Sequence, residues 1–200
     1  MLNLLFRTGM YAAIVLFFVT GSFSVAVCQD HAYSLLSPDK KIRIEFGVGQ
    51  LDKKSPDSNQ LYYCVSFKGK PLLNNSTMSL DIDGYKALGS DVHIVNTANS
   101  SVNQAYKLVT GKTTDVNETY STLQITLEEN IAPKRKLVIE AKAYNDAVAF
   151  RYIVPAENAS SKGYQLKNEQ TEFHFSKDAI TYAQVLPHYQ SMYESEYPKL

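Results

Sequence analysis

The segment "LVIEAKAYNDAVAFRYIV", residues Leu137–Val154, decides the fold. Two stretches with a two-residue apolar alternation flank Asn145 and Asp146, which are residue types that tolerate the positive φ of a tight turn. The segment therefore predicts an antiparallel hairpin in which Leu137–Tyr144 pairs with Ala147–Val154. Apolar residues occur on both faces of its second strand, so we expect both faces to be largely covered. Two packed sheets explain such coverage better than one solvated sheet does.

The same two-residue period recurs along most of the chain after Tyr33, and no segment there sustains the 3.6-residue period of a helix. Polar stretches rich in turn-forming residues separate the alternating segments. The pattern predicts about ten antiparallel strands in an all-β sandwich. The expected strands are residues 33–37, 41–48, 61–67, 76–83, 91–97, 105–111, 121–129, 136–144, 147–155 and 171–176.

Composition restricts the function. The chain has 200 residues, 44% of them hydrophobic, which is enough for a single domain with a real core. Its 20 basic and 20 acidic residues cancel. The sequence therefore lacks the positive field that binding to a phosphate backbone requires, and nucleic acid is not an expected partner.

The first residues have the pattern of a secretory signal peptide. Arg7 is the only charged residue before Asp30, and an apolar run, Met10–Val19, is followed by small and polar residues. Small residues at Ser24, Ala26 and Cys28 permit cleavage near residues 26–28. We expect residues 1–28 to be a signal peptide, residues 29–200 to be the mature domain, and the protein to be secreted, in a bacterium to the periplasm.

Two alternatives for this segment remain open. The uncharged stretch Thr8–Gln29 is long enough to span a bilayer as an uncleaved anchor. Cys28 could instead carry a lipid, although Val27 is a poor fit to the small residue expected before a lipidated cysteine. Every one of these readings takes the rest of the chain out of the cytoplasm. The alternating context of Cys64 predicts a thiol buried in the core.

Most catalytic and metal-binding signatures are absent from the sequence. "DIDG", Asp81–Gly84, begins like a calcium loop, but Val92 stands where such a loop needs its closing glutamate, so we expect a strand end and a turn. Glu128 and Glu129 are adjacent, point to opposite faces of a strand, and are expected to be a solvated strand end. The four histidines are not at metal-ligand spacing: His31, His93, His174 and His188.

The last residues raise a different possibility. In an extended "HYQSMYESEY", His188–Tyr197, the carboxylates of Glu194 and Glu196 lie on one face. They are either solvated side chains of an exposed loop or ligands aimed at a cation or a sugar. Calcium takes about six to eight oxygens and two glutamates supply at most about four, so the remaining ligands would come from other polypeptide. The sequence therefore looks truncated at its C-terminal end.

Several segments, in this order and at these separations, resemble the amino-terminal domain of glycoside hydrolase family 97. They are "YSLLSPDKKIRIEF", "LYYCVSFKGKPLL", "AYNDAVAFRYIVP", "KNEQTEFHF" and "MYESEY", and "YNDAVAFRY" is the most specific. The resemblance spans Tyr33–Leu200. It implies an antiparallel, galactose-mutarotase-like β-supersandwich that packs on a catalytic (β/α)8 barrel, within a secreted enzyme that hydrolyses α-glucosides or α-galactosides in α-linked oligosaccharides. The choice between these substrates stays open because the pocket lies in the barrel.

The family also uses an active-site calcium ion, to which the sandwich contributes one glutamate. The resemblance places that role on Glu194, with Glu196 as the reserve, and implies no catalytic residue in this chain. Two departures are that Ala147 stands where glycine is frequent and that the chain has no tryptophan. A non-catalytic carbohydrate-binding module that uses Tyr189, Tyr193 and Tyr197 is the alternative, and a structural or adhesive surface domain is a further one.

Overall fold

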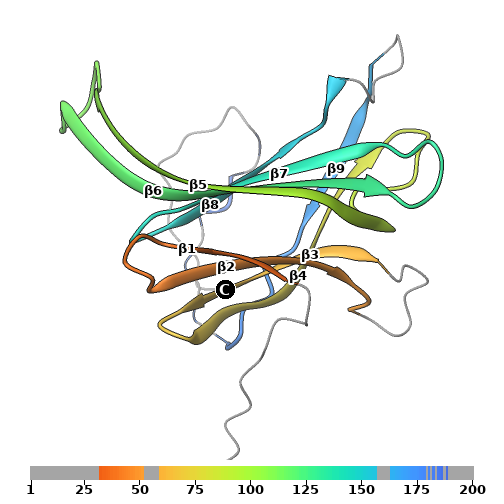
Figure 1. The fold of residues 1–200 in the computed structure, drawn as a ribbon, viewed down its shortest axis with the longest axis horizontal. Coiled ribbons are helices and arrows are strands. Elements are labelled where there is room, and N and C mark those ends of the chain that lie inside the picture. Colours follow the sequence, from red (N-terminus) through yellow and green to blue (C-terminus); the bar gives the residue numbers. More distant parts are fainter. Residues whose placement is uncertain are drawn as a thin grey trace, which may run out of the picture.

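A computed structural model describes residues 32–51, 59–156, 163–178, 180, 182, 184–186 and 188. These residues form nine antiparallel strands in two facing sheets, and the described part of the chain contains no α-helix (Figure 1). Accordingly, no apolar helix of membrane-spanning length is present among them. The expected all-β sandwich is confirmed. The predicted signal peptide, residues 1–28, lies outside the described residues.

The sheets differ in size. The larger has five strands in the order β1-β2-β3-β4-β9, and the smaller has four in the order β5-β6-β7-β8. The bounds of the larger sheet are β1 Tyr33–Leu36, β2 Ile42–Gly49, β3 Gln60–Phe67, β4 Lys70–Ile82 and β9 Leu166–Thr171. Those of the smaller are β5 Val92–Lys107, β6 Asp115–Glu129, β7 Lys136–Ala143 and β8 Val148–Ile153. Thus β9 returns to pair with β4 after the whole smaller sheet has been formed.

The core lies between the two sheets. On β7 every second residue is buried, as the two-residue period predicts, and Leu123, Ile125 and Leu127 opposite on β6 are buried too. Aromatic side chains of both sheets meet here: Phe150 of β8 packs edge-on against Phe46 of β2, with ring centroids 6.2 Å apart, and lies 5.0 Å from the ring of Tyr63 on β3. These contacts fix the sheets face to face.

The hairpin of β7 and β8 is confirmed, with Ala143 opposite Val148, but two details of its prediction are wrong. Neither Asn145 nor Asp146 has positive φ in the described structure. Instead, Tyr144 N donates to Ala147 O at 2.8 Å, and Asn145 Oδ1 accepts a hydrogen bond of 2.9 Å from Asp39 N in the β1–β2 turn. The loop is therefore held by the neighbouring sheet. In addition, Ala149 and Arg151 are exposed, so only the face toward the core is covered.

Two strand predictions also need correction. The sequence predicts separate strands at residues 91–97 and 105–111, but the first and the beginning of the second belong to one long strand, β5, because its polar middle also pairs with β6. Residues 108–111 lie beyond the end of β5. The strand expected at 171–176 is wrong: β9 ends at Thr171. Beyond it the chain follows β4 through individual hydrogen bonds, from Glu172 N to Thr77 O (3.0 Å) and from Ser176 N to Leu72 O (3.0 Å).

Strands β5 and β6 extend beyond the sandwich as a two-stranded arm (Figure 1). Strand β7 pairs with β6 only over Ser121–Glu128, so the part from Asp115 to Tyr120 is paired with β5 alone. Side-chain hydrogen bonds cross the arm, from Tyr106 Oη to Glu118 Oε1 (2.7 Å) and from Gln104 Nε2 to Glu118 Oε2 (3.1 Å). The arm is thus a polar ribbon with little core of its own.

Candidate functional site

The predicted calcium ligands, Glu194 and Glu196, lie outside the described residues, as do the tyrosines at 189, 193 and 197 and the histidine at 31. Within the described residues no group of three or more His, Cys, Asp or Glu side chains could hold a metal ion. His93 and His174 lie on different elements with different partners. As expected, "DIDG" is the end of β4 followed by a turn.

A groove of about 640 Å³ lies on the outer face of the larger sheet. We call it the outer groove. Charged and polar side chains of three strands line it together with a few apolar residues and the segment after β9. The lining residues used below are Arg43 and Glu45 on β2, Cys64 and Ser66 on β3, Asn74 and Asn75 on β4, His174, and the apolar Leu51, Pro71 and Leu73.

A β-bulge shapes the middle of this groove. Tyr63 is opposite Ser76, but Val65 is already opposite Leu73, so Cys64 faces two residues of β4, Asn74 and Asn75. A bulge re-aims side chains and bends its strand, which is why bulges are frequent near binding sites. Here it brings two neighbouring amide side chains into the lining of the outer groove. The segment beyond β9 fixes the bulge, because Asn74 N donates to His174 O at 2.8 Å.

The charges of the outer groove are paired. Arg43 Nη1 lies 3.6 Å from Glu45 Oε1, and Lys41 Nζ lies 2.9 Å from Asp39 Oδ2. The thiol of Cys64 donates to Glu45 Oε2 at 3.7 Å. The prediction that Cys64 is buried in the core is therefore wrong: the side chain is half-buried and lines the outer face of the sheet.

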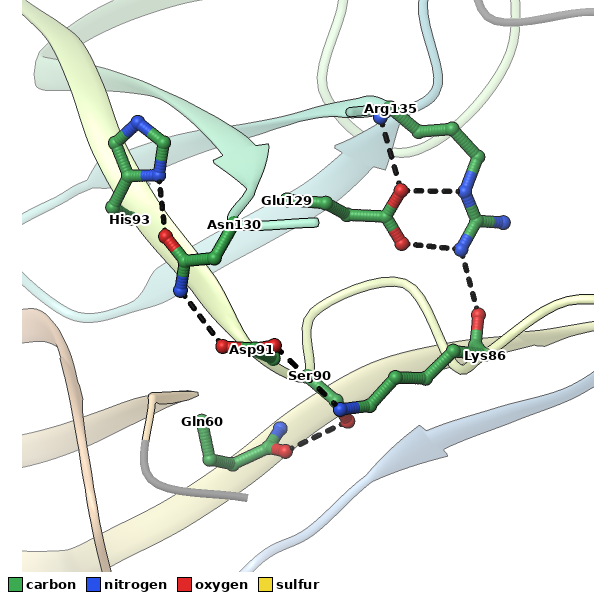
Figure 2. A network of polar contacts seen from close by, with 8 residues as sticks. All are labelled: Gln60, Lys86, Ser90, Asp91, His93, Glu129, Asn130 and Arg135. Carbon is green, nitrogen blue, oxygen red and sulfur yellow. Dashed lines mark hydrogen bonds and ion pairs between the residues drawn. The ribbon is translucent and has the colours of Figure 1, made fainter. Parts of the chain in front are cut away.

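A second polar cluster closes one end of the sandwich (Figure 2). Glu129 and Arg135 are each only 3% exposed, and the Glu129 carboxylate accepts hydrogen bonds from Arg135 Nη2, from Nε (2.8 Å) and from the Arg135 backbone N (3.0 Å). Glu129 was expected at a solvated strand end. That expectation is wrong because the β6–β7 connection folds back and places a guanidinium against the carboxylate.

The cluster continues to neighbouring elements. Arg135 Nη2 also donates to Lys86 O at 2.7 Å, and Arg135 Cζ lies 4.8 Å from the centroid of the Tyr85 ring. Asn130 accepts from His93 Nδ1 and donates to Asp91, both at 2.8 Å. Glu129 and Arg135 are buried, whereas His93 and Asn130 at the edge of the cluster are exposed. The contacts connect β5, β6 and the β4–β5 connection, so the role of the cluster is structural. The sequence offered only one signal for it, a glutamate and an arginine on either side of a turn.

On the side where β8 and β9 lie, a hydrogen bond between Tyr152 of β8 and Thr171 of β9 joins the two sheets, and further hydrogen bonds lie beside it. Thr171 Oγ1 donates to Glu169 Oε1 at 2.7 Å, so Tyr152 Oη is the donor in its 2.7 Å contact with Thr171. Tyr63 Oη donates to Glu172 O, also at 2.7 Å. Burial raises the pKa of Tyr63 and that of Tyr152 to about 12. Both phenols therefore stay protonated at neutral pH and act as fixed donors.

The same side of the sandwich exposes large aromatic side chains. Phe173 and Phe175 are 57% and 65% exposed, although Phe173 packs edge-on against Tyr63 with ring centroids 6.3 Å apart. They continue the core-facing side of the larger sheet past β8, where the described smaller sheet ends. We call this surface, made of Tyr152, Glu169, Thr171, Phe173 and Phe175, the open seam. Neighbouring exposed aromatic side chains of this kind make the open seam a candidate interaction surface.

Comparison with known proteins identifies the domain. A family model described as the glycosyl-hydrolase 97 N-terminal domain matches residues 35–200. A curated relative, a retaining alpha-galactosidase of Bacteroides thetaiotaomicron, is 21% identical over 146 residues, which are 73% of this chain and 19% of the relative. The chain thus spans about a fifth of the length of this relative.

Solved structures share the fold. A glycoside hydrolase family 97 enzyme from Pseudoalteromonas sp. strain K8, in complex with panose, has a TM-score of 0.62 at 22% identity, over 72% of this chain and 20% of that one. The same enzyme with acarbose gives 0.61 at 23%, again over 72% and 20%. A beta-arabinopyranosidase gives 0.64 at 20%, over 83% and 26%. At such identities these structures support the fold alone, while the family model covers most of the sequence. The chain therefore belongs to the family of glycosyl-hydrolase 97 N-terminal domains.

Proposed function

We propose that this chain is the amino-terminal sandwich domain of a secreted, calcium-dependent α-glycoside hydrolase. The carrying observation is the family match over residues 35–200, together with relatives that are about five times longer than the matched region. In this proposal the domain performs no bond cleavage itself. It packs on a catalytic (β/α)8 barrel that follows in the parent enzyme and helps to complete an active site for α-linked oligosaccharides.

The open seam is the docking surface in this proposal. Two exposed phenylalanines lie beside a half-buried tyrosine and a glutamate, so the surface offers an apolar centre with a polar rim, as domain interfaces do. The segment that carries these phenylalanines leads toward the end of the chain where the candidate calcium ligands lie. Docking at the seam would therefore bring that end close to the barrel.

Glu194 is the proposed calcium ligand, with Glu196 in reserve. The described residues alone do not fit the ion, because they contain no cluster of three potential ligands. Glu194 would therefore supply one or two oxygens, and residues of the barrel and water would supply the rest. When bound, calcium would polarise and orient substrate oxygens. The contribution of this chain would be to hold a carboxylate at the domain boundary, and acid and base groups would come from the barrel.

Calcium titration of the parent enzyme tests this role. We expect Glu194→Gln to weaken calcium binding by at least about tenfold and to reduce α-glycoside hydrolysis in parallel, because one anionic ligand is lost. Glu196→Gln is the matched control and should leave both values near those of the parent. If Glu196→Gln weakens calcium binding and Glu194→Gln does not, Glu196 is the calcium ligand instead. If both variants bind calcium as the parent does, this chain contributes no carboxylate ligand.

Secretion has a separate test. We propose that residues 1–28 direct export and are removed, so the mature protein recovered from outside the cytoplasm should begin near Gln29. N-terminal sequencing of that protein checks it. An intact leader would support the uncleaved anchor, and a lipid-modified cysteine at the new amino terminus would support lipidation of Cys28. Recovery from the cytoplasm would contradict export.

A further inference from the structure

The outer groove has the size and shape of a ligand site, and neither the family match nor the relatives assign one to it. Its volume of about 640 Å³ lies within the range of roughly 300–1,000 Å³ that is common for small-molecule sites. Its floor is β-sheet, so the lining strands hold one another in register. The β-bulge opposite Cys64 interrupts this regular pairing and brings Asn74 and Asn75 into the lining of the groove.

The charges of the lining argue against an anionic ligand. Arg43 is beside Glu45, and Lys41 is beside Asp39, so each cation already has a carboxylate neighbour. A phosphate or sulfate would have to compete with these carboxylates and would approach their negative charge. Recognition of such anions ordinarily relies on cations that are available to them. A cationic ligand would meet Lys41 and Arg43, and the Glu45 carboxylate already has Arg43 and the Cys64 thiol as partners. The ligand is therefore expected to carry no net charge.

The polar groups also argue against a purely apolar ligand. Asn74, Asn75 and His174 offer donors and acceptors in the lining, and Glu45 offers carboxylate oxygens. Covering these groups with an apolar molecule would remove their water without replacing its hydrogen bonds. At the same time, Leu51 and Pro71 provide apolar surface among the polar groups. The ligand must present hydroxyl groups and C–H surface together.

We propose that the outer groove binds a neutral saccharide of two or three sugar units. Amide and carboxylate side chains pair with neighbouring hydroxyls, since a hydroxyl both donates and accepts, while Leu51 and Pro71 contact the C–H surfaces of the rings. The groove is on the outer face of the larger sheet, whereas the open seam continues its core-facing side. This site is therefore distinct from the proposed docking surface and needs no catalytic barrel.

Cys64 provides a built-in reporter for this site. The sequence has two cysteines, so Cys28→Ser leaves Cys64 as the single thiol of the chain. The experiment measures the rate at which N-ethylmaleimide modifies this thiol, with maltotriose or raffinose as the added saccharide. At about ten times its dissociation constant a bound saccharide that covers the thiol should slow modification about tenfold. Glycine betaine at equal osmolality controls for solvent effects.

Two matched substitutions locate the effect. Ser66→Trp places a bulky side chain in the outer groove and should abolish protection by saccharide. Gln124→Trp places the same side chain at an exposed position on the outer face of the smaller sheet and should leave protection intact. Each modification rate is compared with that of the same variant without saccharide, so a changed basal reactivity of Cys64 does not affect the result.

Amide NMR shifts of the unsubstituted chain give an independent reading. Saccharide should shift the amides of residues 41–45, 64–66 and 73–75, which surround the outer groove. The proposal is overturned if neither saccharide slows modification of Cys64 and neither shifts these amides. It is also overturned if the saccharide protects Cys64 equally well in the Ser66→Trp variant. Shifts confined to the open seam would also overturn it. None of these results depends on hydrolysis or calcium, so the proposed enzymatic role of the parent stands or fails separately.

Discussion

At the scale of single residues, Glu129 and Arg135 form a buried ion pair that stabilises one end of the β-sandwich. The other ion pairs given for the described residues have substantially exposed partners, such as Lys107 and Asp115 on the arm, whereas both members of this pair are buried. Burying two charges costs several kcal/mol of desolvation, which the mutual attraction and added hydrogen bonds offset only while both partners are present. Removing one partner alone should therefore destabilise the fold more than replacing both with apolar residues.

We expect Arg135→Ala to lower the free energy of unfolding by about 3–5 kcal/mol, because it leaves the Glu129 carboxylate buried without its cation. The double substitution Glu129→Met and Arg135→Met should cost distinctly less. Urea unfolding followed by circular dichroism measures both. Lys107→Ala, which breaks an exposed pair, serves as the control and should change stability by no more than about 0.5 kcal/mol. An Arg135→Ala loss as small as that of the control would contradict the argument.

The turn between β1 and β2 contains a pH-dependent residue. Hydrogen bonds from Ser37 and Lys41 hold the pKa of Asp39 at about 2, below its ordinary value of 3.8. A depressed folded-state pKa means that the carboxylate stabilises the fold fully above its unfolded pKa, and that this contribution is lost as the pH falls from about 4 toward 2. The melting temperature of the Asp39→Asn variant should therefore lie below that of the unsubstituted chain at about pH 6. Near pH 2 the two melting temperatures should approach each other. A constant difference across this range would show that the charge of Asp39 is unimportant.

At the scale of elements, the arm of β5 and β6 is the part with the least support. Cross-strand bonds such as those to Glu118 hold it, but an isolated two-stranded ribbon is only marginally stable in water. The remainder of β6 is different, because β7 covers its second edge and its inward side chains lie in the core. One strand therefore combines a stable half and a weakly held half.

Hydrogen exchange should reveal this division within β6. We expect the amides of residues 115–119 to exchange at least about 100-fold faster than those of residues 123–127, because residues 115–119 are not paired with β7 and none of them is buried. Mass spectrometry of peptides that separate the two halves measures the ratio. Equal protection in both halves would indicate that the arm is covered by a partner in solution, and dilution of the sample would then restore the difference.

The sequence could predict those strands whose own residues alternate between apolar and polar. The alternation of Ile42–Phe46 and of Leu137–Ala143 predicted β2 and β7, since each strand has one buried face. Strand β9 has the sequence "LKNEQT" without alternation, and only its pairing with the distant β4 makes it a strand. The partner of Glu129 and the outer groove were missed for the same reason, because both result from contacts between segments remote in sequence. Glu194 stays a prediction.

At the scale of the whole molecule, the unequal sheets leave the open seam on one side. The phenylalanines there face the same side as buried Tyr63, so they extend the core surface without a covering strand in the described part of the chain. Their burial would contribute about 25 cal/mol per Å² of apolar surface, which favours association with any suitable surface. The seam is therefore expected to be adhesive in the separated domain.

We expect Phe175→Ser to change the stability of the separated chain by less than about 0.5 kcal/mol, because the side chain is already mostly exposed. It should also reduce the chain's binding of a hydrophobic dye and lower the melting temperature of the parent enzyme. Val109→Ser is a suitable control, since Val109 is fully exposed at the tip of the arm. If the Phe175→Ser and Val109→Ser variants of the parent enzyme have the same melting temperature, the open seam is not the docking surface.

The pairing of β9 with β4 has a consequence for how the chain folds during synthesis. Strand β4 appears early, but its partner is made only after all strands of the smaller sheet, so an unpaired edge persists while the chain elongates. Closing this long loop is slow, and exposed strand edges attract other nascent chains in the meantime. Amino-terminal fragments that stop before Leu166 should therefore aggregate, and delivery of the chain in an unfolded, chaperone-held form would protect this edge until β9 arrives.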